Sequence, residues 1–195
     1  MNRPAAPLDP ADVVRRLLDA APTCGPVRVL AVDGPAGSGK TTAAERLARE
    51  LGGAPLVHLD DLLEGWTGKL AAVWERLDAQ LLEPLACGAP AGYRRFDWAA
   101  DRFAEWVPVP DHRFLVVEGV GSAARAVDAR LAVRVWVEAP PGLRLRRGIV
   151  RGGEAQRANW LRWAEWEHHH FAEDGTRERA DVLVDGTARE VTVEP

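Results

Sequence analysis

The sequence contains one segment whose residue types and spacing are those of a phosphate-binding loop. The Walker A pattern is matched at every required position by Gly34, Pro35, Ala36, Gly37, Ser38, Gly39, Lys40 and Thr41. Glycines in such a loop let successive backbone N–H groups turn toward the phosphates of a nucleotide at the start of a helix. Lys40 would neutralise the outer phosphates, and the Thr41 hydroxyl would be offered to Mg²⁺. We therefore expect ATP and Mg²⁺ as cofactors, with Thr42 completing the nucleotide-binding segment.

Acidic residues that directly follow apolar runs are candidates for proton transfer and metal binding. Asp60 and Asp61 follow one such run, and Glu118 follows another. Phosphoryl transfer needs an acceptor oxygen aligned with the γ-phosphate, and a carboxylate near the loop can orient that oxygen and take its proton. On an extended chain Asp60 and Asp61 point to opposite sides, so we expect one to be catalytic and the other structural or part of the metal shell. Glu118 is predicted to join Thr41 in the water shell of Mg²⁺, with a contact to the acceptor hydroxyl as the alternative.

Three arginines at helical spacing are candidates for phosphate contacts. Arg144, Arg147 and Arg151 stand at i, i+3 and i+7, which places them on one face of a helix. Planar guanidinium groups suit bidentate contact with phosphate oxygens while charge shifts during transfer. We expect all three to contact the nucleotide and Arg147 to assist catalysis. The alternative is a solvated basic helix whose arginines pair with glutamates.

The elements that must position these residues follow from the hydrophobic pattern. Nearly continuous apolar runs predict strands over residues 27–32, 55–59, 114–117, 131–137 and 181–184. Helices are expected over residues 40–51 and 69–85, with an amphipathic helix before the first strand. We predict an α/β, three-layer P-loop NTPase fold, with a five-stranded parallel sheet covered by helices on both faces. The chain is expected to form a single domain, residues 1–195.

Ligands of such folds collect at the carboxyl ends of the parallel strands. The residues that end the predicted strands are therefore expected to share one edge of the sheet. They are Asp33, Asp60, Asp61, Glu118 and Asp185.

Composition excludes several other classes of protein. The formal net charge of −4 provides no basic surface of the kind that nucleic-acid binding requires, so we expect no nucleic-acid partner. The sequence has no apolar segment of membrane-spanning length and no signal-peptide pattern, which predicts a cytoplasmic protein without a membrane partner.

The cysteines and lysines narrow the class of protein further. Cys24 and Cys87 lie in no paired metal spacing, and we interpret them as reduced structural thiols. Lys40 and Lys69 are the only lysines, so the Asn-Lys-x-Asp or Thr-Lys-x-Asp segment of a GTPase is absent.

Four segments resemble the uridine kinase and phosphoribulokinase family in order and spacing: VDGPAGSGKTT, HLDD, VVEG and RLRRGIVR. The resemblance covers most of the chain from Val29 to Arg151 and implies an ATP-dependent phosphotransferase with an alcohol group as acceptor. In that family the first acid after the second strand accepts the proton of the hydroxyl, and the matching residue is Asp60. The resemblance implies a single P-loop kinase domain over residues 1–195, with an Arg-rich helical lid at about residues 140–175. The last segment matches this lid, but Gly152 stands where the family has Asp.

The resemblance also places the acceptor site in the aromatic and charged stretch from Tyr93 to Trp98. Its rings would stack on a base, Asp97 would bind ribose hydroxyls, and Arg94 or Arg95 would face an acidic substituent. Alternatively, these aromatic side chains cover the edge of the sheet. The expected substrate contacts are Asp60, Asp61, Trp66, Tyr93, Arg94, Asp97 and Glu118.

Trp160, Trp163 and Trp166, followed by His168 to His170, depart from the family pattern. Tryptophans three residues apart form a stripe on a helix, which predicts core packing or an interface in a homo-oligomer rather than a cofactor site. Three consecutive histidines fan over about 200° around a helix and cannot converge on one metal ion.

These observations predict a Mg²⁺-dependent kinase that transfers the γ-phosphoryl group of ATP to a hydroxyl of a small molecule. A nucleoside of the uridine type is the expected acceptor, and the turn at Gly186 and Thr187 is the expected adenine contact. A nucleotide, a sugar acid or another small alcohol is the alternative acceptor. The alternative from a different class is a non-catalytic, ATP-binding regulatory protein.

Overall fold

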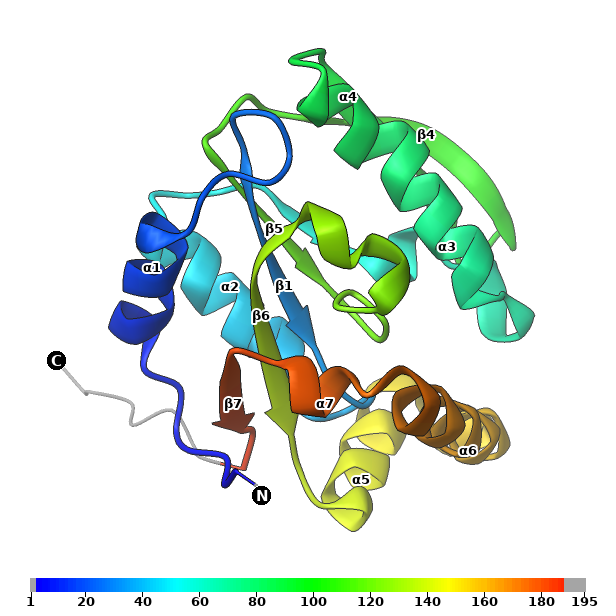
Figure 1. Ribbon diagram of the computed structural model, residues 1–195. Coiled ribbons are helices and arrows are strands. Elements are labelled where there is room, and N and C mark those ends of the chain that lie inside the picture. The colour runs from blue at the N-terminus through cyan, green and yellow to red at the C-terminus, as the bar shows by residue number, and fades with distance from the viewer. Residues whose placement is uncertain (1–2, 188–195) are drawn as a thin grey trace, which may run out of the picture.

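The computed structural model of the protein describes residues 3–187. Its main sheet has five parallel strands in the order β2-β5-β1-β6-β7 (Figure 1), which confirms the predicted sheet and the α/β P-loop fold. These strands are β1 (Arg28–Asp33), β2 (Leu56–His58), β5 (Phe114–Glu118), β6 (Leu131–Glu138) and β7 (Val182–Asp185).

Helices surround the sheet, as the apolar patterns predicted. The helix expected over residues 69–85 is continued through a π-helical turn, Asp78–Leu82, which separates α3 from α4. No helix within residues 3–187 has both the length and the apolar character that a membrane span requires. The helices are α1 (Pro10–Asp19), α2 (Lys40–Glu50), α3 (Leu70–Leu77), α4 (Glu83–Ala86), α5 (Pro141–Gly152), α6 (Arg157–Asp174) and α7 (Thr176–Arg179).

The sheet divides the core into two layers, because successive side chains of a strand point to opposite faces. Leu30 and Val32 of β1 pack with α1 and α2, whereas Val29 and Ala31 pack with α3. Figure 1 shows α1 and α2 on one side of the sheet and α3 on the other. A strand buried on both faces reads as a continuous apolar run, and this is why β1 and β5 could be predicted.

A two-stranded antiparallel hairpin was not predicted. It consists of β3 (Ala91–Asp97) and β4 (Arg102–Val109), which lie beside α3 in Figure 1. Its register shifts between Arg94 and Phe96, as at a β-bulge, so the strand loses the simple alternation of apolar and polar residues. The sequence pattern of this segment therefore does not indicate strands.

The start of the P-loop is held by the buried carboxylate of Asp33, the last residue of β1. Its Oδ1 accepts the N–H groups of Gly34 at 2.7 Å and Gly121 at 2.9 Å, and its Oδ2 accepts the N–H of Ala123 at 2.8 Å. Burial raises the pKa of Asp33 to about 6, although these three N–H groups act in the opposite direction. The carboxylate thus ties the P-loop to the loop that follows β5.

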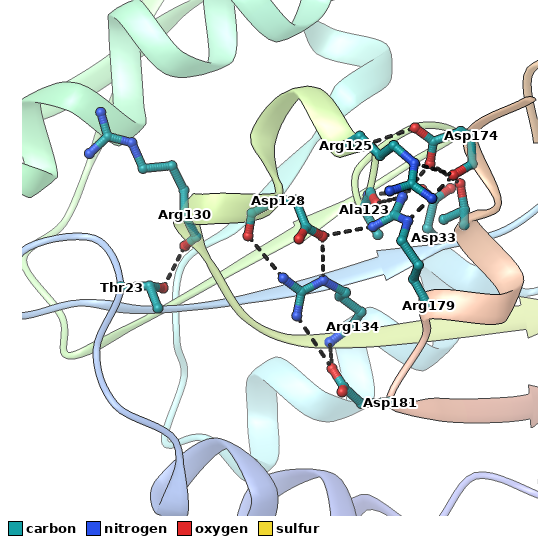
Figure 2. Close-up of polar contacts among 11 residues, drawn as sticks. Thr23, Asp33, Ala123, Arg125, Asp128, Arg130, Arg134, Asp174, Arg179 and Asp181 are labelled. Carbon is teal, nitrogen blue, oxygen red and sulfur yellow. Dashed lines mark hydrogen bonds and ion pairs between the residues drawn. The ribbon is translucent and has the colours of Figure 1, made fainter.

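A network of ion pairs extends from the same loop to the C-terminal elements (Figure 2). Arg179 Nη2 donates to the carbonyl oxygen of Ala123 at 2.9 Å, and its Nη1 contacts Asp128 Oδ1 at 2.7 Å. Asp128 also accepts the Nε of Arg134 at 2.6 Å, and Asp181 accepts the Arg134 backbone N–H at 2.7 Å. The segment that holds Asp33 is therefore fixed to α7, β6 and the start of β7.

Helices α5 and α6 lie together beyond the carboxyl ends of β1 and β6 (Figure 1), within the range predicted for the lid. Gly148 of α5 is buried against the indole of Trp160 on α6. A Cβ on Gly148 would lie 2.9 Å from the nearest atom of that ring, closer than non-bonded carbon atoms normally approach. The two helices pack closely because this position carries no side chain.

We predict that Asp33→Ala lowers the free energy of unfolding by at least about 2 kcal/mol, because three buried N–H groups lose their acceptor. Asp33→Asn, which keeps one carbonyl oxygen, should cost less. Urea denaturation measures both changes. Asp111→Ala, at an exposed position, is the control and should change stability by no more than about 0.5 kcal/mol. Equal effects of Asp33→Ala and Asp111→Ala would contradict the anchoring role.

Gly148→Ala should lower the stability of the protein by about 1 kcal/mol, because the clash with Trp160 outweighs the gain in helix propensity. Gly142 of α5 is a matched control, since a Cβ there meets only the flexible Arg146 side chain, at 3.7 Å. Gly142→Ala should leave stability unchanged or raise it by up to about 1 kcal/mol. Thermal unfolding of the two variants tests the difference, and stabilisation by both would show that the α5–α6 contact is loose.

Candidate active site

The loop between β1 and α2 forms a backbone cradle at the N-terminus of α2. Gly37 has a φ of 76°, and a Cβ there would lie 2.5 Å from the carbonyl oxygen of Arg144. Gly39 is the N-cap residue, and no side chain among the described residues caps α2, so the first N–H groups of the helix are available to an anion. Lys40, the next residue, is largely buried. The cradle therefore offers N–H donors and one shielded ammonium group to a phosphate.

Thr41 and Glu118 meet beside the cradle. Thr41 Oγ1 donates to Glu118 Oε1 at 3.3 Å, and His58 Nδ1 lies 2.6 Å from the same oxygen. This hydrogen bond raises the pKa of His58. The other oxygen of Glu118, Oε2, is buried and has no hydrogen-bond partner within residues 3–187. A carboxylate with an unused buried oxygen is suited to bind a further polar group.

These oxygen atoms fit a Mg²⁺ ion that arrives with a nucleotide. Mg²⁺ is usually bound by one or two protein oxygens, the phosphates of the substrate and several waters. In the described part of the chain, no group of three or more His, Cys, Asp or Glu side chains is placed to hold a metal ion by itself. A hydroxyl at Thr41 and a carboxylate at Glu118 could complete the shell of an ion whose other ligands are phosphates and water.

Asp60 and Asp61 lie in a 3₁₀ turn, Leu59–Asp61, and not on an extended chain as predicted. The Tyr93 hydroxyl donates to Asp61 Oδ2 at 2.9 Å. The Asp60 carboxylate is exposed and makes no hydrogen bond within the described residues. Although solvent reaches it, the surrounding protein raises its pKa by desolvation, against the effect of the Lys40 charge. Asp60 thus provides a free carboxyl group close to the cradle.

Arg144 and Arg147 lie on α5 beside the cradle, and their guanidinium groups are bonded to protein atoms. Arg144 Nη1 lies 2.7 Å from Glu167 Oε1. Arg147 Nη1 donates to the carbonyl oxygen of Gly37 at 3.1 Å, and its Nη2 donates to that of Gly186 at 3.0 Å. Arg147 therefore contacts the P-loop directly, and Arg144 is connected to it through Glu167. Contact with a nucleotide would require them to exchange these partners for phosphate oxygens.

Arg151 differs from the other two arginines of α5. It is exposed, and its guanidinium carbon lies 5.2 Å from the centroid of the Trp160 ring, a cation–π distance. Its charge also lowers the pKa of Asp60 in competition with desolvation. Arg151 therefore makes no hydrogen bond or ion pair within the described residues, and its charge acts on Asp60.

Trp66 connects three segments beside Asp60 through ring contacts. Its ring centroid lies 5.8 Å from that of Trp98 at the end of β3, and 5.0 Å and 6.4 Å from those of Trp160 and Trp163 on α6. Trp98 Nε1 donates to the backbone carbonyl of Asp60 at 3.1 Å. The indole rings of Trp66 and Trp98 therefore lie next to the 3₁₀ turn that contains Asp60.

Three other predicted acceptor contacts, Tyr93, Arg94 and Asp97, already have partners within the protein. The Tyr93 side chain is buried, which is at odds with the expected stacking of a base on its ring. Arg94 Nη1 donates to a backbone carbonyl of β4 at 2.9 Å. Asp97 accepts two N–H groups of the following turn, which lower its pKa. An open hollow of about 390 Å³ adjoins these residues and is lined in part by Asp61, Asp97 and Trp98.

Two residues of this site, His58 and Glu167, were not predicted from the sequence. His58 had a usable signal, because it ends β2 two residues before Asp60. Glu167 lies on α6, and its Oε2 accepts the N–H of Ala36 in the cradle at 2.8 Å. Helical spacing alone does not mark Glu167 as different from the other polar residues of this helix.

No protein-family model and no curated protein matches this sequence. Among solved structures, the chain is similar to a possible uridine kinase from Bacillus stearothermophilus, with 23% identity and a TM-score of 0.64. It is also similar to a candidate fructose transport system kinase from Silicibacter sp. TM1040, with 20% identity and a TM-score of 0.63. Each comparison covers 91% of this chain and 98% of the other. The chain has the P-loop fold of these two proteins, which confirms at the level of fold the resemblance predicted from its four motifs.

Proposed function

We propose that the protein is an ATP- and Mg²⁺-dependent kinase, formed by one domain, that transfers the γ-phosphoryl group to a hydroxyl of a nucleoside-like small molecule. One observation carries this proposal: Asp60 presents an open carboxyl group directly after β2, at the edge of the sheet where the phosphate cradle lies, and the charge of Lys40 acts on this carboxyl group. A carboxylate in this position can orient a hydroxyl toward the γ-phosphate and accept its proton.

The proposed roles of the other residues follow from their positions around the cradle. Backbone N–H groups between Gly34 and Thr42 would bind the phosphates, and Lys40 would neutralise the outer ones. Thr41 and Glu118 would hold Mg²⁺, which when bound offsets the negative charge of the transferring group. The acceptor oxygen bonds to the γ-phosphorus, its proton passes to Asp60, and the bond from that phosphorus to the departing ADP oxygen breaks.

The arginines of α5 are proposed to stabilise the charge on the transferring group. Arg151 is exposed and makes no hydrogen bond or ion pair within the described residues, so it can bind a phosphate without exchanging such a partner, by leaving its cation–π contact with Trp160. Arg147 is close to the loop but is held by carbonyl oxygens of Gly37 and Gly186. Its catalytic role, like the phosphate contact proposed for Arg144, requires an exchange of partners when ATP binds.

The nucleoside assignment is supported by the aromatic surface next to Asp60. Trp66 and Trp98 are held there by ring contacts and by the hydrogen bond to the Asp60 carbonyl. Indole rings are good partners for a planar base. The names of the two similar structures point to a nucleoside in one case and a sugar in the other. A nucleotide, a sugar acid or another small alcohol is therefore the alternative acceptor.

Asp60→Asn should lower kcat by about 10²–10⁴-fold with little loss of ATP affinity, because the amide can orient a hydroxyl but cannot take its proton. The measurement is ATP consumption with Mg²⁺ and nucleosides, nucleoside monophosphates and other alcohols, together with ATP binding by calorimetry. Asp61→Asn is the matched control. Its amide oxygen can still accept the Tyr93 hydroxyl, so we expect a loss of less than about tenfold.

Three results would change the proposal in different ways. Turnover with a non-nucleoside acceptor would keep the kinase and discard the nucleoside. A larger loss in Asp61→Asn than in Asp60→Asn would transfer the role of base to Asp61. ATP binding without turnover on any acceptor would favour a non-catalytic regulatory protein.

A further inference from the structure

Glu167 is a buried carboxylate that the proposed reaction does not use. It lies on α6, and its side chain is 2% exposed. Its two oxygens contact different elements: Oε2 accepts the Ala36 N–H of the P-loop at 2.8 Å, and Oε1 lies 2.7 Å from Arg144 Nη1 of α5. These contacts join residues separated by 131 and 23 positions in the sequence. Glu167 is thus the point at which α5, α6 and the P-loop meet.

The groups around Glu167 are those that would bind a phosphate. They comprise a backbone N–H of the loop, a guanidinium group and, through space, the ammonium group of Lys40. Burial raises the pKa of Glu167, while these three groups act in the opposite direction. A buried carboxylate is costly unless it is paired and hydrogen-bonded, and Glu167 satisfies both conditions here. A paired carboxyl group therefore occupies a position beside the loop.

A γ-phosphate would bring further negative charge to this position. Lys40 of a P-loop reaches the outer phosphates, so the γ-phosphate must approach the same ammonium group that interacts with Glu167. Like charges at close range in a shielded site repel strongly. ADP, which lacks this phosphate, does not create the same conflict.

We infer that Glu167 stands in for an outer phosphate oxygen, and that the γ-phosphate of ATP displaces it and releases Arg144 to bind the nucleotide. Glu167 then determines how strongly the site distinguishes ATP from ADP, and it couples the position of α6 to the number of phosphates bound. This inference rests on the nucleotide-binding part of the proposed function and does not depend on the identity of the acceptor.

Binding measurements on Glu167→Gln test the inference without any acceptor. The substitution removes the charge but leaves a side-chain oxygen that can accept the Ala36 N–H. We expect the affinity for MgATP to rise at least about fivefold, while the affinity for MgADP changes by less than about twofold, both measured by calorimetry. Glu165→Gln is the matched control, because Glu165 is exposed on the same helix and makes no ion pair within the described residues. It should leave both affinities unchanged.

A second measurement on the wild type covers the case in which Glu167→Gln fails to fold. Trp166 adjoins Glu167 and is partly exposed, so its fluorescence reports displacement of α6. MgATP should change the tryptophan emission, MgADP should not, and Trp166→Phe should reduce the change.

Parallel weakening of ATP and ADP binding in Glu167→Gln, or equal emission changes with both nucleotides, would overturn the inference and leave Glu167 as a structural anchor. Failure of the wild type to bind either nucleotide is a distinct result. It would remove nucleotide binding from the proposed function, and the displacement of Glu167 with it.

Discussion

The geometry of the candidate site depends on how the chain turns at the end of β1. Asp33 accepts three backbone N–H groups, one from the next residue and two from the loop after β5. Gly34 then turns so close to β6 that a Cβ would lie 2.1 Å from the carbonyl oxygen of Val137. Because these contacts are with β6 and with the loop that follows β5, the position of the P-loop is set by the neighbouring elements of the parallel sheet.

The same edge of the sheet brings carboxylates and cations together, and in the ligand-free protein most of these charges have partners. Arg144 pairs with Glu167, Arg147 is held by backbone carbonyls, and His58 contacts Glu118. Partners are necessary because an unpaired charge in a shielded site is costly. A bound nucleotide must therefore replace existing interactions, so its net affinity is smaller than the sum of its phosphate contacts. Asp60 and Arg151 are exceptions, since both are exposed to solvent.

The sequence predicted the parts of the fold in which local pattern and burial agree. The run that ends at Asp33 is buried on both faces of the sheet, and the glycines that follow permit only a tight turn into α2, so β1, the P-loop and α2 were predictable. The β3–β4 hairpin was not predictable, because the shift between Arg94 and Phe96 disrupts the alternation of a strand.

Asp60 and Asp61 were placed on the correct edge, but their 3₁₀ turn depends on tertiary contacts with Tyr93 and Trp98. Glu167 could not be found at all, since its importance depends on a contact with Ala36, 131 residues away.

The arrangement of α6 links the two halves of the candidate site. One end of this helix supplies Trp160 and Trp163, which contact Trp66 on the acceptor side, and the next turns supply Glu167, which contacts the phosphate cradle. A helix is stiff over the two turns between Trp160 and Glu167, so these contacts cannot change independently unless the helix bends. Close packing of Trp160 on Gly148 further ties α6 to α5, which carries the arginines. Any displacement of Glu167 by a nucleotide must consequently move the tryptophan side chains beside Asp60. The same helix therefore controls both nucleotide binding and the shape of the acceptor pocket.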